Sequence, residues 1–233
     1  MSNDFATVRV ARAWDEGPRL RALELDPGAT GFAAKHTLPG QYVRARMPGQ
    51  KEAFLAIASA PGATALELLL QKSAPGDPPK PVDALAALAT GDSLEISAPG
   101  GKGYPVEAER GRDLLLFAGG SGISAIRSLV EWIAAHRADY GRAVLLFGAR
   151  TADDLAYRSL FERWGGHRIE VVPVLSRAAQ GWTGRTGYVP VALADLAIDP
   201  AKASAFVTGG KAFDAGIAEA LGKLGVTRIF RNF

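Results

Sequence analysis

The stretch Leu114-Leu115-Leu116-Phe117-Ala118-Gly119-Gly120-Ser121-Gly122 passes directly from a continuous apolar run into a cluster of glycines. An unbroken apolar run is typical of a strand that is covered on both faces of a parallel sheet. Ile123, Ile126, Val130 and Ile133 then follow at helical spacing. The stretch therefore predicts a buried strand, a glycine-rich turn and a helix, which together begin a βαβ unit.

Strands and helices continue to alternate after this unit. The expected order is strand Ala143–Phe147, helix Leu155–Trp164, strand Ile169–Leu175, helix Val191–Leu196, strand Ala205–Thr208, helix Ala212–Leu224 and strand Thr227–Phe233. Such alternation predicts a parallel-sheet α/β domain, because parallel strands need helical crossovers between them.

The preceding residues have a different periodicity. Thr7–Ala13 and Tyr42–Met47 alternate apolar and polar side chains, as half-buried strands do. Turn residues separate four further short strands and one helix, predicted at Leu20–Leu25, Phe54–Ala58, Leu66–Leu70, Leu94–Ser97 and, for the helix, Val82–Leu88. Six short strands at this spacing predict an antiparallel barrel or sandwich. We therefore expect two domains, 1–108 and 109–233.

Composition excludes several kinds of site. The chain has 233 residues and no Cys, which excludes disulfides, thiolate-bound iron–sulfur clusters, Cys-ligated zinc and a cysteine nucleophile. Its three His residues are scattered, so we expect no His-rich metal site.

The charge pattern and the apolar runs bear on partners and location. The net charge is only +3 and no long run of like charge occurs, so we expect no nucleic-acid partner. A modest basic face toward an acidic protein remains open. No basic segment precedes an apolar stretch at the start of the sequence, and no apolar run approaches the ~20 residues that span a bilayer. We predict a cytoplasmic protein without a membrane span.

The glycine-rich turn has a chemical interpretation. Glycines let the backbone approach a ligand closely, and the N-terminus of the following helix offers free N–H groups and a positive dipole end. Both features favour a pyrophosphate, and open α/β sheets bind ligands at the carboxyl ends of their strands. The alternative is that these glycines serve only tight packing.

A series of short motifs along almost the whole chain resembles the ferredoxin–NADP reductase family, and within it the plant fruit-protein-type branch. The motifs are Gly40-Gln41-Tyr42-Val43, Phe54-Leu55-Ala56-Ile57-Ala58-Ser59, Gly91-Asp92, Phe117–Ser124, Phe147-Gly148-Ala149-Arg150, Trp182-Thr183-Gly184, Thr208-Gly209-Gly210 and Asn232-Phe233. The resemblance implies a flavin-binding antiparallel six-stranded β-barrel followed by an NAD(P)-binding α/β domain. It also implies hydride transfer between nicotinamide and flavin, with FAD and NADP or NAD as cofactors.

On the dinucleotide side, the resemblance places the pyrophosphate on Gly119–Ile123, although Ala125 stands where the family usually has Pro. Arg127 keeps an Arg that is often found in that helix. Ser176-Arg177 resembles the pair that holds the 2′-phosphate in NADP-specific members of the family, and this resemblance favours NADP over NAD. The alternative is that Arg177 is an ordinary exposed loop residue. The implied dinucleotide contacts beyond the glycine turn are Arg150, Ser176, Arg177, Tyr188 and Gly209.

On the flavin side, the sequence departs from the family pattern. The family's Arg-x-Tyr-Ser reads Ala53-Phe54-Leu55-Ala56 here, so three polar side chains that would hold the flavin are replaced. The segment left to contact a flavin edge is Leu55, Ala56, Ile57, Ala58 and Ser59. Lys102, in the turn Gly100–Gly103, is the implied substitute cation for the flavin diphosphate. The alternative is that this turn only connects the domains.

Two further positions concern the chemistry itself. Thr208 stands where the family has a Cys against the nicotinamide, and its hydroxyl is able to bond a carboxamide. Phe233 resembles a C-terminal aromatic that stacks on the flavin; the alternative is that it closes a hydrophobic face. We predict an NAD(P)H-dependent flavin oxidoreductase with a separate electron acceptor, a small acidic redox protein being one candidate. The alternative is a non-catalytic nucleotide-binding or accessory module with weak or lost FAD binding.

Overall fold

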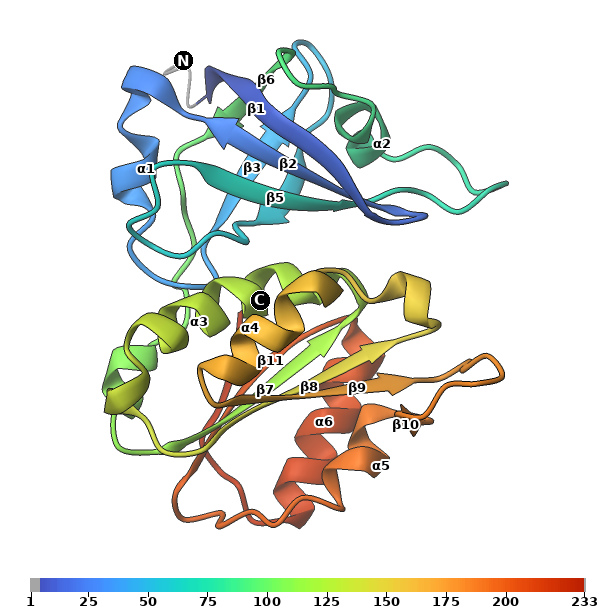
Figure 1. Ribbon diagram of the computed structural model, residues 1–233. Coiled ribbons are helices and arrows are strands. Elements are labelled where there is room, and N and C mark those ends of the chain that lie inside the picture. The colour runs from blue at the N-terminus through green and yellow to red at the C-terminus, as the bar shows by residue number, and fades with distance from the viewer. Residues whose placement is uncertain (1–4, 233) are drawn as a thin grey trace.

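The computed structural model describes residues 5–232, which form two six-stranded sheets (Figure 1). The first is antiparallel, in the order β4-β3-β6-β1-β2-β5, with β1 (Phe5–Gly17), β2 (Leu20–Asp26), β3 (Tyr42–Arg46), β4 (Ala53–Ala56), β5 (Leu66–Gln71) and β6 (Ser93–Ser97). Its edges meet where Ile57 pairs with Leu68 and the Ala58 N–H donates to the Glu67 carbonyl at 2.7 Å. The predicted antiparallel barrel is confirmed.

Two short helices connect strands of the barrel. Helix α1 (Phe32–Lys35) lies between β2 and β3 and was not predicted, whereas α2 (Pro81–Ala86) corresponds to the expected helix at Val82–Leu88. Leu85 and Ala86 of α2 are buried with the aliphatic side chains that fill the barrel. Helix α2 therefore covers one opening of the barrel, because its apolar residues have no other core to enter.

The second sheet is parallel, in the order β10-β9-β8-β7-β11-β12. Its strands are β7 (Asp113–Gly119), β8 (Ala143–Ala149), β9 (Ile169–Leu175), β10 (Arg185–Thr186), β11 (Ala203–Thr208) and β12 (Ile229–Arg231). The face toward the barrel carries α3 (Ile123–Ala135) and α4 (Phe161–Gly166), and the opposite face carries α5 (Val189–Leu193) and α6 (Lys211–Lys223) (Figure 1). Strand order reverses at β7, and such a switch point is where open α/β sheets form a ligand crevice.

The barrel packs on the parallel sheet through α3. One hydrophobic core joins Leu20, Ala58 and Leu69 of the barrel to Ile126 and Leu129 of α3. The proposed domain boundary after residue 108 falls in the segment between β6 and β7, within a 3-10 turn. We retain the division 1–108 and 109–233 as a proposal.

The predicted helix at Leu155–Trp164 is wrong over its first half. The α-helix begins only at Phe161, after a 3-10 turn at Arg158–Leu160. Tyr157 interrupts the helical path because its backbone is left-handed, with φ of 60°. Long-range contacts hold Tyr157 there: its N–H donates to a Glu16 carboxylate oxygen at 2.6 Å, and its ring is buried. Tertiary contacts therefore override the local helical pattern.

Candidate functional site

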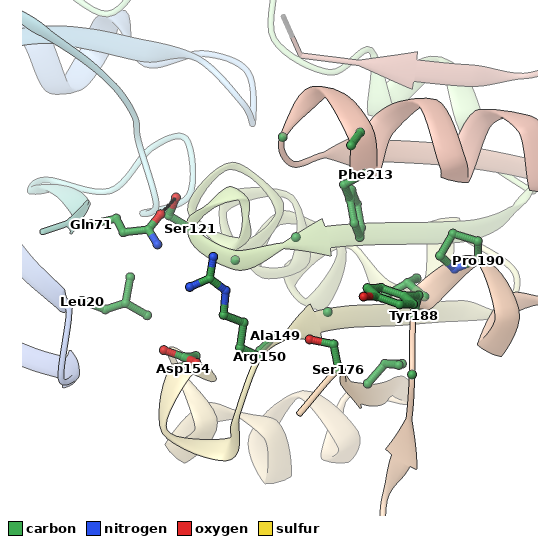
Figure 2. Close-up of a pocket in the computed structure, with 18 of the residues that line it drawn as sticks. Leu20, Gln71, Ser121, Ala149, Arg150, Asp154, Ser176, Tyr188, Pro190 and Phe213 are labelled. Atoms are coloured by element: carbon green, nitrogen blue, oxygen red, sulfur yellow. Dashed lines mark hydrogen bonds between the residues drawn. The ribbon is translucent and has the colours of Figure 1, made fainter. Parts of the chain in front are cut away.

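A pocket of about 540 Å³ opens at the carboxyl ends of the parallel strands. We call it the sheet pocket; it is lined by Arg19, Leu20, Gln71, Gly119, Gly120, Ser121, Gly148, Ala149, Arg150, Asp154, Val174, Ser176, Gly187, Tyr188, Val189, Pro190, Gly210, Ala212 and Phe213. Figure 2 shows Arg150 reaching from the end of β8 toward Ser121 and Gln71, with Tyr188 and Phe213 on the other side. Tyr188 is 71% exposed, so its side chain is accessible to a ligand.

Arg150 is the cation of the sheet pocket that is available to a ligand. Its guanidinium is exposed and has no hydrogen-bond or ion-pair partner within residues 5–232. Arg19, by contrast, already donates to the Lys72 carbonyl at 2.9 Å. An unpaired guanidinium suits a phosphate because it offers several donors in a fixed plane.

Two positions in the turn after β7 require glycine for structural reasons. Gly120 has φ of 54°, a left-handed conformation that favours glycine. A Cβ on Gly122 would lie 2.5 Å from the Thr208 carbonyl oxygen. Gly122 therefore lets the start of α3 approach the end of β11, which brings the glycine turn beside Thr208.

A second pocket, of about 470 Å³, lies between the barrel and the same glycine turn. We call it the interdomain slot; it is lined by Ala53, Phe54, Leu55, Ala56, Leu69, Gln71, Val82, Gly119, Gly120, Ser121, Gly122, Ser124, Thr208, Gly209 and Gly210. The glycine turn is a wall shared with the sheet pocket, and the Ser121 hydroxyl of this wall donates to the Gln71 side-chain carbonyl at 3.0 Å. A ligand in the sheet pocket can thus extend one end into the slot.

Thr208 is held by a residue that the sequence did not suggest. Its hydroxyl is hydrogen-bonded to the hydroxyl of Tyr104, a fully buried residue in the segment joining the two sheets. The Tyr104 hydroxyl also approaches the Val207 carbonyl oxygen at 3.3 Å. Burial raises the pKa of the Tyr104 phenol, so it stays protonated. Tyr104 therefore fixes the orientation of the Thr208 hydroxyl at the edge of the slot.

Arg127 has a structural partner rather than a ligand. Its guanidinium forms an ion pair with Glu67 of β5 at 2.7 Å and donates to the Ala58 carbonyl at 3.2 Å. The ring of Tyr157 lies under it, 4.5 Å from the guanidinium carbon. Next to it, the Ser128 hydroxyl donates to the Ser59 carbonyl at 2.7 Å. Together these contacts join α3 to the connection between β4 and β5; we call this cluster the α3 clamp.

The structure brings many of the predicted residues to the two pockets. Those that line a pocket are Leu55, Ala56, Gly119, Gly120, Ser121, Gly122, Arg150, Ser176, Tyr188, Thr208 and Gly209. Ile57, Ala58 and Ile123 are fully buried behind them, and Ser59 accepts a hydrogen bond from the Glu67 N–H at 3.1 Å. Lys102 and Arg177 are exposed outside both linings. Phe233 lies outside the described residues.

The residues present fit a dinucleotide in the sheet pocket. The glycine turn supplies backbone N–H groups, Arg150 an unpaired cation, and Tyr188 and Phe213 aromatic surfaces. The interdomain slot fits the flat ring of a flavin, because Leu55, Ala56 and Leu69 give it an apolar wall.

Comparisons with known proteins agree with this geometry. Residues 116–219 match the Oxidoreductase NAD-binding domain family. The chain is 32% identical over 188 residues to fruit protein pKIWI502 of Actinidia deliciosa, covering 73% of this chain and 57% of that protein. It is 26% identical over 188 residues to sulfhydrogenase 1 subunit gamma of Pyrococcus furiosus, covering 78% and 62%. The chain thus spans less than two thirds of the length of these relatives.

Solved structures show the same fold. A ferredoxin NADP+ reductase from Neisseria gonorrhoeae, with bound FAD and NADP, superposes with a TM-score of 0.83 at 18% identity, over 99% of this chain and 98% of that one. The FAD/NAD-binding domain of a nitric oxide dioxygenase from Vibrio cholerae gives a TM-score of 0.84 at 19% identity, over 97% and 96%. With the barrel-then-sheet order, these structures show that the chain has the fold of the ferredoxin–NADP reductases, and its residues 116–219 match an oxidoreductase NAD-binding domain.

Proposed function

We propose that this chain is an NAD(P)H-dependent flavin oxidoreductase that passes electrons to a separate acceptor. The observation that carries the proposal is the wall of glycines shared by the sheet pocket and the interdomain slot. A dinucleotide whose pyrophosphate lies on Gly119–Ile123 would place its nicotinamide beside Thr208 and the apolar wall of the slot. A flavin bound there would supply the hydride acceptor.

The roles that we propose for individual residues follow from this placement. Backbone N–H groups of the glycine turn and Gly209 bind the pyrophosphate, and Arg150 binds a phosphate of the adenosine half. Ser176 and Tyr188 contact the adenosine, and Arg177 approaches the 2′-phosphate of NADP from the same loop. The Thr208 hydroxyl, oriented by Tyr104, bonds the carboxamide and positions the nicotinamide.

The backbone supports Arg177 as a neighbour of Arg150, because the Arg177 N–H donates to the Arg150 carbonyl at 2.8 Å. We keep NADP as the favoured dinucleotide and NAD as the alternative. Leu55–Ser59 and Lys102 stay proposals for flavin contact, and Phe233 for stacking on the flavin.

The test is NADPH oxidation by the purified chain with added FAD and a dye acceptor. We expect turnover that saturates with NADPH and that falls in Arg150→Ala, because this change removes the unpaired guanidinium of the sheet pocket. Turnover that requires no flavin, or that is unaffected by Arg150→Ala, would refute this assignment of the two pockets.

A second candidate is a nucleotide-binding module without catalysis. It is favoured by Ala53, Leu55 and Ala56, which stand where the resemblance implies Arg, Tyr and Ser. NADPH binding without oxidation in the same assay would support this candidate.

For the enzyme, a small acidic redox protein remains the acceptor class that the net charge of +3 favours. No helix within residues 5–232 is long and apolar enough to cross a membrane. A cytoplasmic location stays a prediction.

A further inference from the structure

The interdomain slot differs from the sheet pocket in charge. Every residue that lines the slot is uncharged, and its polar side chains are Gln71, Ser121, Ser124 and Thr208. The sheet pocket next to it contains three charged residues, the arginines Arg19 and Arg150 and the carboxylate Asp154. A diphosphate is normally held by cations that form charge-assisted hydrogen bonds. Cationic side chains that could bind a diphosphate are present in the sheet pocket, whereas the interdomain slot has only neutral side chains.

The helix that borders the slot carries a negative charge of its own. Val82 lines the slot, and the next residue of α2, Asp83, accepts hydrogen bonds from the Lys80 and Ser73 N–H groups, both at 2.7 Å. These bonds lower the pKa of the Asp83 carboxyl, so it is ionised at neutral pH. A phosphate brought here would meet backbone donors already in use and a like charge.

The two arginines of the neighbouring strand β3 already have other partners. Arg44 of β3 lies opposite Phe54 of β4. It pairs with Glu52 at 3.5 Å and lies over the Phe5 ring. Arg46 pairs with Glu95 at 2.7 Å. Lys102 is exposed outside the lining of the slot.

We infer that the interdomain slot recognises the isoalloxazine ring of a flavin and does not discriminate among riboflavin, FMN and FAD. This inference rests on the proposed function, since it specifies the flavin of the same site. A flavin held only by its ring exchanges readily, so it serves as a substrate that leaves after reduction. NAD(P)H then loses two electrons as a hydride, the flavin gains them with that hydrogen and one solvent proton, and NAD(P)+ and dihydroflavin are released.

The experiment is titration of the full chain with riboflavin, FMN and FAD, read by quenching of flavin fluorescence. We expect dissociation constants within about threefold of one another and little dependence on salt, because no cation lines the slot to distinguish the ligands by their phosphates. FAD that binds about tenfold or more tightly than riboflavin, with an affinity that falls as salt is raised, would overturn the inference while supporting the proposed function. No binding of any flavin would overturn both.

A substitution that adds the missing cation sharpens the test. Ala53 lies on β4 in the lining of the slot, so Ala53→Arg should tighten FAD and FMN by about tenfold relative to riboflavin. Ala53→Gln is the matched control, because it adds comparable length without charge and should leave the three affinities alike. If Ala53→Arg folds but its affinities for FAD and FMN relative to riboflavin are unchanged, the flavin phosphates do not pass through the slot, and the inference is contradicted. The salt dependence of the unaltered chain decides the matter if Ala53→Arg fails to fold.

Discussion

Arg127→Met is expected to destabilise the fold strongly, although Arg127 touches neither pocket. The Arg127 and Glu67 side chains are only 14% and 8% exposed, and their charged groups lie 2.7 Å apart. Removing the guanidinium leaves a buried carboxylate without its counter-ion, a change that costs about 3–5 kcal/mol in free energy of unfolding. Replacing both charges by apolar side chains removes that penalty, so Arg127→Met with Glu67→Leu should recover most of the loss.

Urea unfolding followed by far-ultraviolet circular dichroism measures these free energies. The matched control is Lys223→Met, which breaks the ion pair with Glu219 at the same distance of 2.7 Å on the exposed face of α6. We expect no measurable loss there, because solvent screens exposed pairs. Equal losses in Arg127→Met and Lys223→Met, or a double variant as unstable as the single one, would refute the account of the α3 clamp.

Three further outcomes are expected. Arg177→Ala should weaken NADPH binding more than NADH binding. Equal effects in titrations with both dinucleotides would show that Arg177 does not contact the 2′-phosphate. Gly122→Ala should lower stability by about 1–3 kcal/mol and weaken NADPH, since its Cβ would meet the Thr208 backbone, whereas Gly165→Ala, with open space, should be tolerated. Burial lowers the pKa of His36 from 6.5 to about 4. As the pH falls, His36 of the unfolded chain therefore takes up a proton before His36 of the folded chain does, so the free energy of unfolding decreases by about 3 kcal/mol from pH 6.5 toward 4. His36→Gln should remove this pH dependence, as measured by urea unfolding across that range.

Local pattern was sufficient for most of the fold. The apolar run that leads into Gly119–Gly122 predicted β7, the turn and α3. Burial on both faces and helical spacing can be recognised there from residues that are close together in the sequence. Alternation predicted two of the barrel strands, and turn residues marked off the other four. The error at Leu155–Trp164 arose where Tyr157 makes contacts with Glu16 and Arg127, which are distant in sequence.

The sequence by itself determined a barrel followed by a parallel sheet with a glycine turn, and it named residues of both pockets. Only the tertiary structure decided that Tyr104 orients Thr208, that Arg127 pairs with Glu67 rather than with a ligand, and that the interdomain slot is neutral. The physical reason is that a pocket's charge and a hydrogen bond's partner depend on side chains from separate elements. Ala53 of β4 and Val82 of α2 meet at the slot only once the barrel has closed and packed on α3.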